Sequence, residues 1–480
     1  MKWALRPHFV RCRDGCHRAS RGQLSEAGQL ALAHPAYVGY TARPMVPAGS
    51  LLRSLLRLAW PVALARLGIM AMSVVDVMVV GQFAPSQLPF QALGWAPIGV
   101  LTVSGIGLLT GVQVLGARAL GANALHEAGG AWRRGLVVSL CAGAGALAFV
   151  WLLGGHLFTA FGVAPSLALP AARVARILAL SVPLHFLYVT TAFFLESIQR
   201  PLASTVVMWG ANLVNLLLNL WLVPSLGAEG SAWCTVGARG FLAAAVLLWV
   251  WNLDDAERFG VRQRATSPSY RALLRVGTAA FVSHAAEGGA FSGMTVLAGR
   301  QGGDAVAAYQ ILLNLTAIVF MVSLGVSSAT AVLTSEAVGR KAPGAATRAT
   351  FGGLALNIVL MLGAALFIFT FSRAIGRAYT ANLSLAALIS GLLWLVSLVL
   401  PVDGGQVVAA SALRARGDNW FPTASHLVSY ALVMPALAFW LAELRGNGVA
   451  GLLFAIFWSS VLSCSVLCLR LWFHAAQSKA

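Results

Sequence analysis

The sequence predicts an all-α polytopic membrane protein with twelve transmembrane helices in two pseudo-symmetric six-helix bundles. Three observations support this fold class: the composition, a series of long apolar runs, and a repeat that relates the two halves. Of the 480 residues, 59% are hydrophobic and only 10% are charged, against roughly a quarter in an ordinary soluble domain. A soluble fold of this length could not bury so much apolar surface, which excludes a water-soluble enzyme.

The net charge of +18 points to the same class. A charge this basic is also typical of nucleic-acid-binding proteins. Here, however, Lys and Arg lie in short segments between long apolar runs, which is the pattern of a membrane protein's cytoplasmic face. We therefore expect membrane lipids as partners and no nucleic acid.

Twelve runs are long enough to cross a bilayer, which takes about 20 mostly apolar residues. They must be helices, because a span in lipid has to satisfy its own backbone hydrogen bonds and these runs are too long for barrel strands. The predicted spans are 54–83, 90–117, 132–155, 173–198, 202–224, 230–252, 272–300, 304–336, 348–371, 384–413, 422–443 and 448–472.

Proline and glycine account for the breaks between several spans. Pro85 and Pro89 end the first span, and Gly121 follows the end of the second. Pro201 separates the fourth span from the fifth, and Pro224 closes the fifth. Proline removes a backbone donor and glycine adds conformational freedom, so both interrupt helices.

The longest polar connection, 254–270, is the predicted cytoplasmic linker between two six-helix halves at 51–253 and 271–472. Residues 1–50 form a basic N-terminal tail that we expect to be cytoplasmic and disordered. Residues 473–480 form the C-terminal tail.

Alternate connections differ in their content of Lys and Arg. One set, which includes Arg118, Arg200, Arg340 and Arg414, carries fourteen, while the other set carries six. Because basic connections stay inside, this predicts that both termini are cytoplasmic. We expect a multi-pass protein of the bacterial inner membrane, present as a monomer.

An internal repeat relates the two halves. The segment 55–58 reappears at 273–276, 218 positions later, and Gly121 matches Gly339 at the same offset. Further along, Pro201 matches Pro422 at an offset of 221. Each half has an even number of spans, so the halves insert in the same direction, an arrangement common in secondary transporters. The transport cavity should therefore lie between them.

Asp76 is an ionisable residue within the first predicted span. The nearest Lys or Arg in sequence is Arg66, ten positions before it, so no local ion pair can neutralise the carboxylate. Such groups are costly in a membrane and are functional candidates by default. A carboxyl that is expensive to keep charged suits a proton carrier, and a carboxylate among amide oxygens equally suits a sodium ion. A structural hydrogen bond to a neighbouring helix is the alternative.

Two further carboxylates lie within spans of the second half. Glu287 lies three residues after His284, on one helix face, which favours either a simple hydrogen-bonded pair or a proton relay. Asp403 follows Pro401, which frees a backbone carbonyl, so a cation or substrate site is plausible there. No second ligand pair accompanies His284 and Glu287, so we expect no metal site and no catalytic cluster.

Spaced polar pairs complete the predicted site. Asn215 and Asn219 lie four residues apart in the fifth span, and Gln310 and Asn314 lie four apart in the eighth. Each pair shares a helix face, and we predict Asn215, Gln310, Asn314 and His284 as secondary cation or substrate-cavity residues. Interhelical hydrogen bonding alone would explain the pairs equally well. His185 is more typical of a structural core histidine.

The energy source follows from what the sequence contains. No Walker phosphate-binding loop occurs. We therefore expect no cofactor and a gradient of Na⁺ or H⁺ as the driving force. One charge crossing 100 mV supplies about 2.3 kcal/mol.

Taken in order over 51–472, the motifs resemble the multidrug and toxic compound extrusion (MATE) family, closest to its NorM-type branch. They are Pro61, Asp76 and Gly81; Gly116 to Gly121; Asn215 to Asn219 with Gly227 and Gly230; Glu287 to Phe291; Ala307 to Gln310; and Asp403 to Gln406, continuing through Leu413, Arg414 and Gly417 to Pro422.

The resemblance implies an antiporter that exports amphipathic, often cationic small molecules in exchange for Na⁺ or H⁺. It also implies that Asp76, Glu287 and Asp403 belong to the acidic positions tied to cation coupling. Ala415, Glu196 and the long basic tail depart from the family pattern. The alternative is a flippase or exporter of a lipid-linked or other endogenous metabolite, which should carry more cationic residues in its cavity than the single candidate Arg66.

Overall fold

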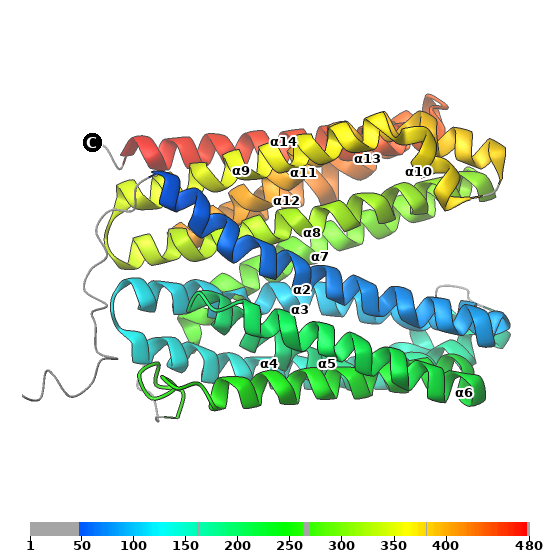
Figure 1. The fold of residues 1–480 in the computed structure, drawn as a ribbon. Helices are drawn as coiled ribbons and strands as arrows, with labels where there is room; N and C mark the ends of the chain where they lie inside the picture. The colour runs from blue at the N-terminus through cyan, green and yellow to red at the C-terminus, as the bar shows by residue number, and fades with distance from the viewer. Residues whose placement is uncertain (1–47, 161–163, 263–268, 381, 478–480) are drawn as a thin grey trace, which may run out of the picture. The chain divides into compact units, whose positions relative to one another are not determined.

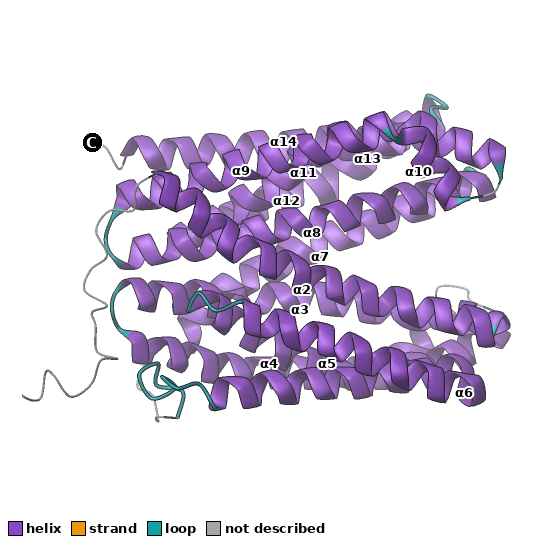
Figure 2. Ribbon diagram, in the orientation of Figure 1, coloured by secondary structure: helices purple, strands orange, loops and turns teal. Residues whose placement is uncertain are grey.

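The computed structural model describes residues 48–160, 164–262, 269–380 and 382–477. Within these ranges the chain is helical and contains no strand (Figure 2). Almost all of the predicted N-terminal tail lies outside the described residues. Its last three residues belong to the first described helix, α2.

The helices of the first half are α2 (Ala48–Phe83), the short η1 (Pro85–Gln87), α3 (Leu88–Gly121), α4 (Leu125–Ala160), α5 (Pro165–Ser197) and α6 (Leu202–Trp251). Those of the second half are α7 (Tyr270–Arg300), α8 (Gly303–Gly339), α9 (Pro343–Thr370), α10 (Ser372–Tyr379), α11 (Leu383–Arg416), α12 (Trp420–His426), η2 (Leu427–Val433), α13 (Met434–Ala438), η3 (Phe439–Leu444) and α14 (Gly448–Gln477). Figure 1 shows their arrangement.

The predicted number of spans is confirmed once two features are considered. Ten described helices are long and apolar enough to cross a membrane. Helix α6 counts once among them, although Gly227, with φ 58° and ψ −132°, breaks it where the predicted fifth and sixth spans meet. Helix α7 is not among the ten, because His284, Glu287 and the arginines of its first turns lower its hydropathy. Dividing α6 and adding α7 gives twelve.

Gly227 is required at the break in α6. Its positive φ is unfavourable for other residues, and the Gln87 side chain occupies the space that a Cβ would need. The Gln87 Oε1 accepts a hydrogen bond of 2.9 Å from the backbone N–H of Ala228, which begins the next helical segment. The sharp change of direction is thus fixed by a cap from η1.

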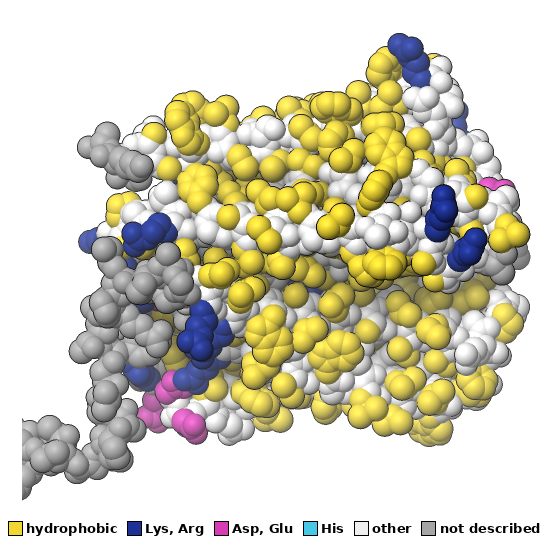
Figure 3. Space-filling model, turned by 45° about the horizontal axis from the view of Figure 1, so that its top comes forward, with side chains coloured by type: hydrophobic (Ala, Val, Ile, Leu, Met, Phe, Trp, Pro, Cys, Tyr) yellow, Lys and Arg dark blue, Asp and Glu magenta, His cyan; other side chains and the backbone are white. Residues whose placement is uncertain are grey.

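The exposed surface of the helices is strongly apolar. Large side chains such as Leu152, Trp221 and Leu383 are 73–77% exposed. Figure 3 shows hydrophobic side chains spread across the face in view. An apolar surface of this extent needs lipid around it. The chain is a multi-pass membrane protein.

The internal repeat appears directly in the packing between the halves. Gly107 of α3 lies against the backbone of Ala280 in α7, and Gly325 of α8 lies against the backbone of Ala59 in α2. Gly107 and Gly325 are 218 positions apart, the offset seen in the sequence. Small residues let membrane helices approach closely, so corresponding glycines of the two halves lie at the contact between them.

The change of offset from 218 to 221 occurs after Thr423. Thr205 and Thr423 donate equivalent hydrogen bonds and are still 218 positions apart, whereas Gly227 and Gly448, both with positive φ, are 221 apart. Pro201 and Pro422 are therefore not structurally equivalent.

The stretches Leu427–Val433 and Phe439–Leu444 are π-helical, whereas the corresponding part of α6 is α-helical. A π-helical stretch accommodates extra residues within a continuous helix. The second half therefore gains residues here without losing the alignment of its helices.

Candidate functional site

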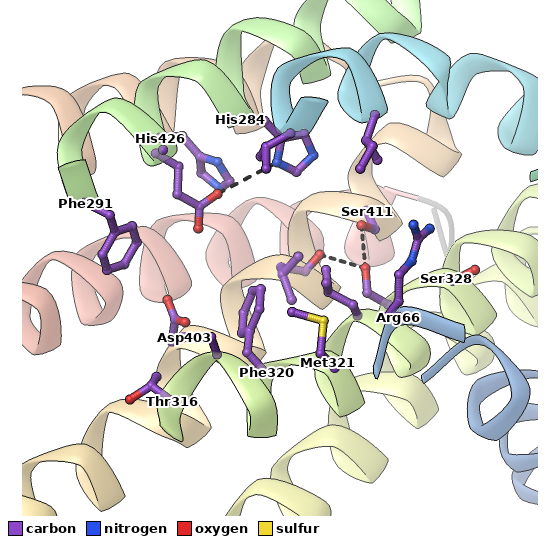
Figure 4. Close-up of a pocket in the computed structure, with 18 of the residues that line it drawn as sticks. Arg66, His284, Phe291, Thr316, Phe320, Met321, Ser328, Asp403, Ser411 and His426 are labelled. Atoms are coloured by element: carbon purple, nitrogen blue, oxygen red, sulfur yellow. Dashed lines mark hydrogen bonds and ion pairs between the residues drawn. The ribbon is translucent and has the colours of Figure 1, made fainter. Parts of the chain in front are cut away.

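The main cavity lies between the halves and has a volume of about 440 Å³. Its walls come from α2, α3 and α5 of the first half and from α7, α8, α11 and α14 of the second. Most of the lining is apolar, including Phe193 and, as Figure 4 shows, Phe291, Phe320 and Met321. A cavity of this size and polarity can hold a small amphipathic molecule.

Glu287 and Asp403 both line this cavity. Asp403 is 6% exposed and its Oδ1 accepts hydrogen bonds from the hydroxyls of Tyr430 (3.3 Å) and Ser460 (3.1 Å). Among the described residues, Glu287 accepts one long hydrogen bond, 3.4 Å from Gln406 Nε2. Glu287 is therefore the less satisfied carboxylate and has capacity to bind a ligand.

His284 is placed beside Glu287, as its spacing predicted. The distance from His284 Nδ1 to Glu287 Oε2 is 3.9 Å, and both residues line the main cavity. This distance is too long for a hydrogen bond. The pair is thus a loose electrostatic contact within the cavity, with room for a water molecule or an ion to intervene.

Arg414 is not in a connection, contrary to the prediction. Helix α11 continues through Arg416, and the Arg414 side chain is 6% exposed and lines the main cavity. Its Nη2 donates to Ser283 Oγ at 2.8 Å, and that hydroxyl also lies 2.9 Å from His426 Nδ1. The apolar residues around Arg414 continue the helix past the expected end, which brings the arginine inside.

Asp76 occupies a second, smaller cavity of about 270 Å³. It is 1% exposed, and its Oδ1 accepts hydrogen bonds from Asn215 Nδ2 (3.0 Å) and Asn219 Nδ2 (2.8 Å). Its Oδ2 accepts from Thr235 Oγ1 at 2.8 Å. The predicted asparagine face therefore meets the predicted carboxylate, and the threonine is a partner that the sequence reasoning missed.

The three carboxylates share one property. Within the described ranges, none of Asp76, Glu287 and Asp403 forms an ion pair with Lys or Arg within 4.0 Å. Arg239, which lines the smaller cavity, instead donates to Ser181 Oγ at 3.0 Å. The carboxylates are thus held by neutral donors, which leaves their charge available to a mobile cation.

The second polar pair behaves differently from the first. Asn314 lines the smaller cavity beside Asp76, although it belongs to the other half. Gln310 lines neither cavity, and its Nε2 is 3.4 Å from Thr295 Oγ1 on the neighbouring helix. The two residues of this pair therefore do not line the same cavity, and a cavity role for Gln310 stays a prediction. His185 is buried and also lines the smaller cavity.

A buried network that joins the halves was not predicted. Glu196 of α5 is 4% exposed, and its Oε2 accepts hydrogen bonds from Gln113 Nε2 (2.5 Å) and Ser328 Oγ (2.6 Å). Gln113 belongs to the first half and Ser328 to the second. In the sequence, Glu196 stood out only as a departure from the family pattern.

Further contacts between the halves gather near the basic connections. Arg118 Nη2 donates to the Ala415 carbonyl at 2.8 Å, and Gln199 Nε2 donates to Glu336 Oε2 at 2.5 Å. Gly121 and Gly339 lie directly against the opposite half. The halves are therefore packed together at this end.

Comparison with known proteins identifies the family. A family model described as MatE matches the chain twice, at residues 61–221 and 280–440. A probable multidrug resistance protein NorM of Caulobacter vibrioides is 42% identical over 438 residues, which cover 89% of this chain and 93% of that protein. The chain belongs to the MATE family. The two matched segments begin 219 positions apart, in agreement with the repeat.

Other members support the same assignment. The multidrug resistance protein NorM of Burkholderia vietnamiensis is 30% identical over 409 residues, covering 82% of this chain and 88% of its own. A crystal structure of a MATE protein in the bent conformation superimposes with a TM-score of 0.81 at 17% identity, over 90% of this chain and 99% of the other. An outward-facing MATE family transporter gives 0.82 at 18% identity, over 89% and 97%. The predicted fold class is thus confirmed.

Proposed function

We propose that the protein is a secondary active exporter that exchanges Na⁺ or H⁺ for amphipathic, often cationic, small molecules at the bacterial inner membrane. The observation that carries the proposal is the main cavity between the halves, where Glu287 and Asp403 face an apolar volume without a Lys or Arg ion pair. The relatives named as multidrug resistance proteins supply the substrate class.

The proposed cycle uses competition for the carboxylates. A cation from outside binds Asp403, Glu287 or Asp76 and lowers the affinity for the exported molecule, which leaves outward. The halves then rearrange, the cavity opens inward and the cation is released. A bound ligand drives such a change only through its different affinities for the two states.

The packing of the halves supports an orientation for this cycle. If the basic connections are cytoplasmic, as the charge pattern predicts, the contacts of Gly121, Gly339 and Arg118 shut the cavity on the cytoplasmic side. The described conformation then corresponds to the outward-facing stage, with both termini cytoplasmic.

Efflux in a pump-deficient bacterial host tests the proposal. Cells expressing the protein are loaded with a fluorescent cation, and efflux is followed while the Na⁺ and H⁺ gradients are collapsed separately. The variants are Asp76→Asn, Glu287→Gln and Asp403→Asn, with Asp304→Asn as a control, because Asp304 is exposed at the start of α8. Efflux that is indifferent to both gradients, or to all three neutralisations, contradicts cation coupling.

The number of arginines in the main cavity bears on the flippase alternative. The sequence suggested one cavity arginine, whereas the main cavity is lined by Arg66 and Arg414. Arg414 Nη2 donates to Ser283, but its buried Nε has no hydrogen-bond partner among the described residues, so both arginines keep donors for a diphosphate. Transport of a fluorescent lipid-linked headgroup, together with no efflux of the cationic dye, would favour this alternative.

A further inference from the structure

Arg66 differs from the other charged residues of the main cavity. It lies on α2, lines the cavity and is half-buried. Within the described part of the chain it forms no hydrogen bond and no ion pair. Its guanidinium carbon lies 5.4 Å from the centre of the Phe193 ring, in a cation–π contact. Its N–H donors are therefore available to a molecule in the cavity.

No charged neighbour of Arg66 pairs with it directly among the described residues. Glu196 attracts it electrostatically but forms no ion pair within 4.0 Å, and its Oε2 accepts hydrogen bonds from Gln113 and Ser328. Arg414, the other cavity arginine, donates to Ser283 and acts electrostatically on Glu287, with which it forms no ion pair within 4.0 Å in the described ranges. The positive charge at Arg66 thus remains incompletely compensated at the cavity wall.

The part of the main cavity around Arg66 is polar and differs from the part around Asp403. Gln113, Ser327, Ser328 and Ser411 line the same cavity, and Figure 4 shows Ser328 and Ser411 on the side of Arg66. Asp403 and Phe291 lie on the opposite side of that view. The cavity therefore has a basic, hydroxyl-lined end and an acidic end.

The apolar residues between these ends separate the opposite charges. Phe320 and Met321 lie between Arg66 and Asp403 in Figure 4. Charges in a partly desolvated cavity interact with a ligand more strongly than charges in water. An elongated molecule with opposite charges at its two ends would match this distribution, with its apolar body against the aromatic side chains.

We propose that Arg66 forms a subsite for a substrate carboxylate, so that the cavity selects amphoteric molecules whose amine faces Glu287 and Asp403. The planar guanidinium matches a carboxylate through two parallel hydrogen bonds. Phe193 orients the guanidinium from one face. This inference rests on the proposed export function and specifies its substrate class.

Two dyes that differ by one methyl ester test the subsite. Rhodamine 110 carries a free carboxylate at neutral pH, whereas rhodamine 123 is its methyl ester and is cationic. Binding of each dye to the purified full-length protein is measured by fluorescence polarisation at pH 7, and efflux of each is measured in the pump-deficient host. The variants are Arg66→Met and Arg66→Lys, with Arg57→Met as a control on an exposed part of the same helix.

Arg66→Met should weaken rhodamine 110 binding about tenfold, as expected for loss of a charge-assisted hydrogen bond, and change rhodamine 123 binding less than about twofold. Arg66→Lys should retain part of the affinity for rhodamine 110, because lysine keeps the positive charge but lacks the two parallel N–H donors of the guanidinium. Arg57→Met should match the wild type for both dyes.

Rhodamine 123 binding shows in the same sample whether each variant is folded. Equal partial losses for both dyes, or no loss for either, overturn the Arg66 subsite while gradient-dependent efflux of rhodamine 123 by the wild type still supports export. Absence of efflux of both dyes from wild-type cells instead counts against the proposed function. If Arg66→Met fails to bind either dye, the comparison of Arg66→Lys with wild type decides: an unchanged preference between the dyes overturns the proposal.

Discussion

The two halves of the protein share a scaffold. Thr205 Oγ1 donates to the Pro61 carbonyl at 2.8 Å, and Thr423 Oγ1 donates to the Ala279 carbonyl at 2.7 Å. Both donors and both acceptors are 218 positions apart. The same bond thus ties the same two helices in each half, which establishes which residues correspond.

At equivalent positions, however, the ionisable groups differ. Four pairs at the offset of 218 are Arg66 and His284, Ile69 and Glu287, His185 and Asp403, and Glu196 and Arg414. All except Ile69 are ionisable, yet no pair contains two residues of the same type. The backbone arrangement has been retained after duplication while the chemistry of the cavity walls has become asymmetric. Such asymmetry gives the cavity distinct acidic and basic ends.

The carboxylates also differ in their surroundings. Asp76 accepts three hydrogen bonds of 2.8–3.0 Å in its own cavity, and its equivalent in the second half is Met294. Glu287 accepts one of 3.4 Å in the main cavity. A molecule in the main cavity can contact Glu287 but not Asp76, so the two sites should separate substrate binding from a part of the cation coupling.

The largest expected effect follows from this separation. Glu287→Gln combined with Asp403→Asn should weaken binding of rhodamine 123 at least about tenfold, since two charges that face the cation are lost. Asp76→Asn should leave binding within about twofold but abolish the dependence of efflux on one of the gradients. Fluorescence polarisation and dye efflux measure the two quantities. If Asp76→Asn weakened binding of rhodamine 123 as much as the double variant does, the separation of substrate binding from cation coupling would be refuted.

The shared scaffold predicts matching effects at equivalent glycines. Gly121→Leu and Gly339→Leu should each lower the free energy of unfolding by about 1–3 kcal/mol, because neither position has room for a side chain against the opposite half. Thermal unfolding in detergent measures this. Gly363→Leu is the control, since nothing lies within 4 Å of a Cβ at that position. A large difference between Gly121→Leu and Gly339→Leu would show that the halves are not packed equivalently.

A smaller effect is expected from the neutral donors at Asp76. Thr235→Val keeps the shape of the side chain but removes the hydrogen bond to Oδ2. One charge-assisted bond corresponds to about 1.5–3 kcal/mol, so the Na⁺ concentration or pH at half-maximal efflux should shift, while binding of rhodamine 123 stays unchanged. The control is Thr278→Val, whose hydroxyl bonds only its own helix at Leu274. An identical shift in both variants would contradict a role for Thr235 in cation binding.

The smallest effect concerns the ion pairs beside α6 and α12. Arg200 forms two hydrogen bonds to Asp255, at 2.9 and 2.7 Å, whereas its equivalent, Asp418, accepts from Arg470 at 2.8 Å and lies 3.2 Å from His474 Nε2. The polarity is reversed between the halves, but each connection is tied by a partly exposed pair. Such pairs contribute about 0–1 kcal/mol.

The pH dependence of the Asp418 contribution follows from its partners. Partial burial alone would raise the pKa of this carboxyl, but the hydrogen bonds and charges of Arg470 and His474 outweigh it and hold the pKa below its usual value. The stabilisation is therefore present above the unfolded pKa of about 3.9 and is lost as the pH falls through the folded value. Asp418→Asn should unfold slightly more easily than wild type at pH 7, and the difference should shrink as the pH falls below about 3.9. Thermal unfolding at pH 7 and over a series of pH values below about 3.9 checks this, and a difference that does not shrink with falling pH would exclude ionisation as its cause.

Sequence spacing predicted part of the candidate site. Asn215 and Asn219 were expected to share a helix face, and they do, because four residues make about one helical turn. Asp76 was expected to lack a cationic neighbour, and none lies within ion-pair distance in the described ranges. What spacing could not show is that these three residues meet, or that Thr235 completes the group, because their contacts span 139–159 positions.

Arg414 and Glu196 illustrate where sequence reasoning was insufficient. A basic residue near the end of an apolar run was assigned to a connection, but α11 extends two residues beyond it and buries it against Ser283 of α7. Glu196 lies at the end of α5, where a solvent-facing side chain would be ordinary. Its hydrogen bonds to Gln113 and Ser328 exist only because the second half packs over it.

The sequence by itself determined the membrane class, the twelve spans, the repeat and the inward position of the carboxylates. These properties depend on local hydropathy and on each span's need to satisfy its own backbone, so they can be read along the chain. The tertiary structure decided how the carboxylates are divided between two cavities and which neutral donors hold them. It also decided that Arg66 faces the main cavity with no hydrogen-bond or ion-pair partner among the described residues. Those features depend on the rotation and packing of helices that are distant in sequence, which no local pattern records.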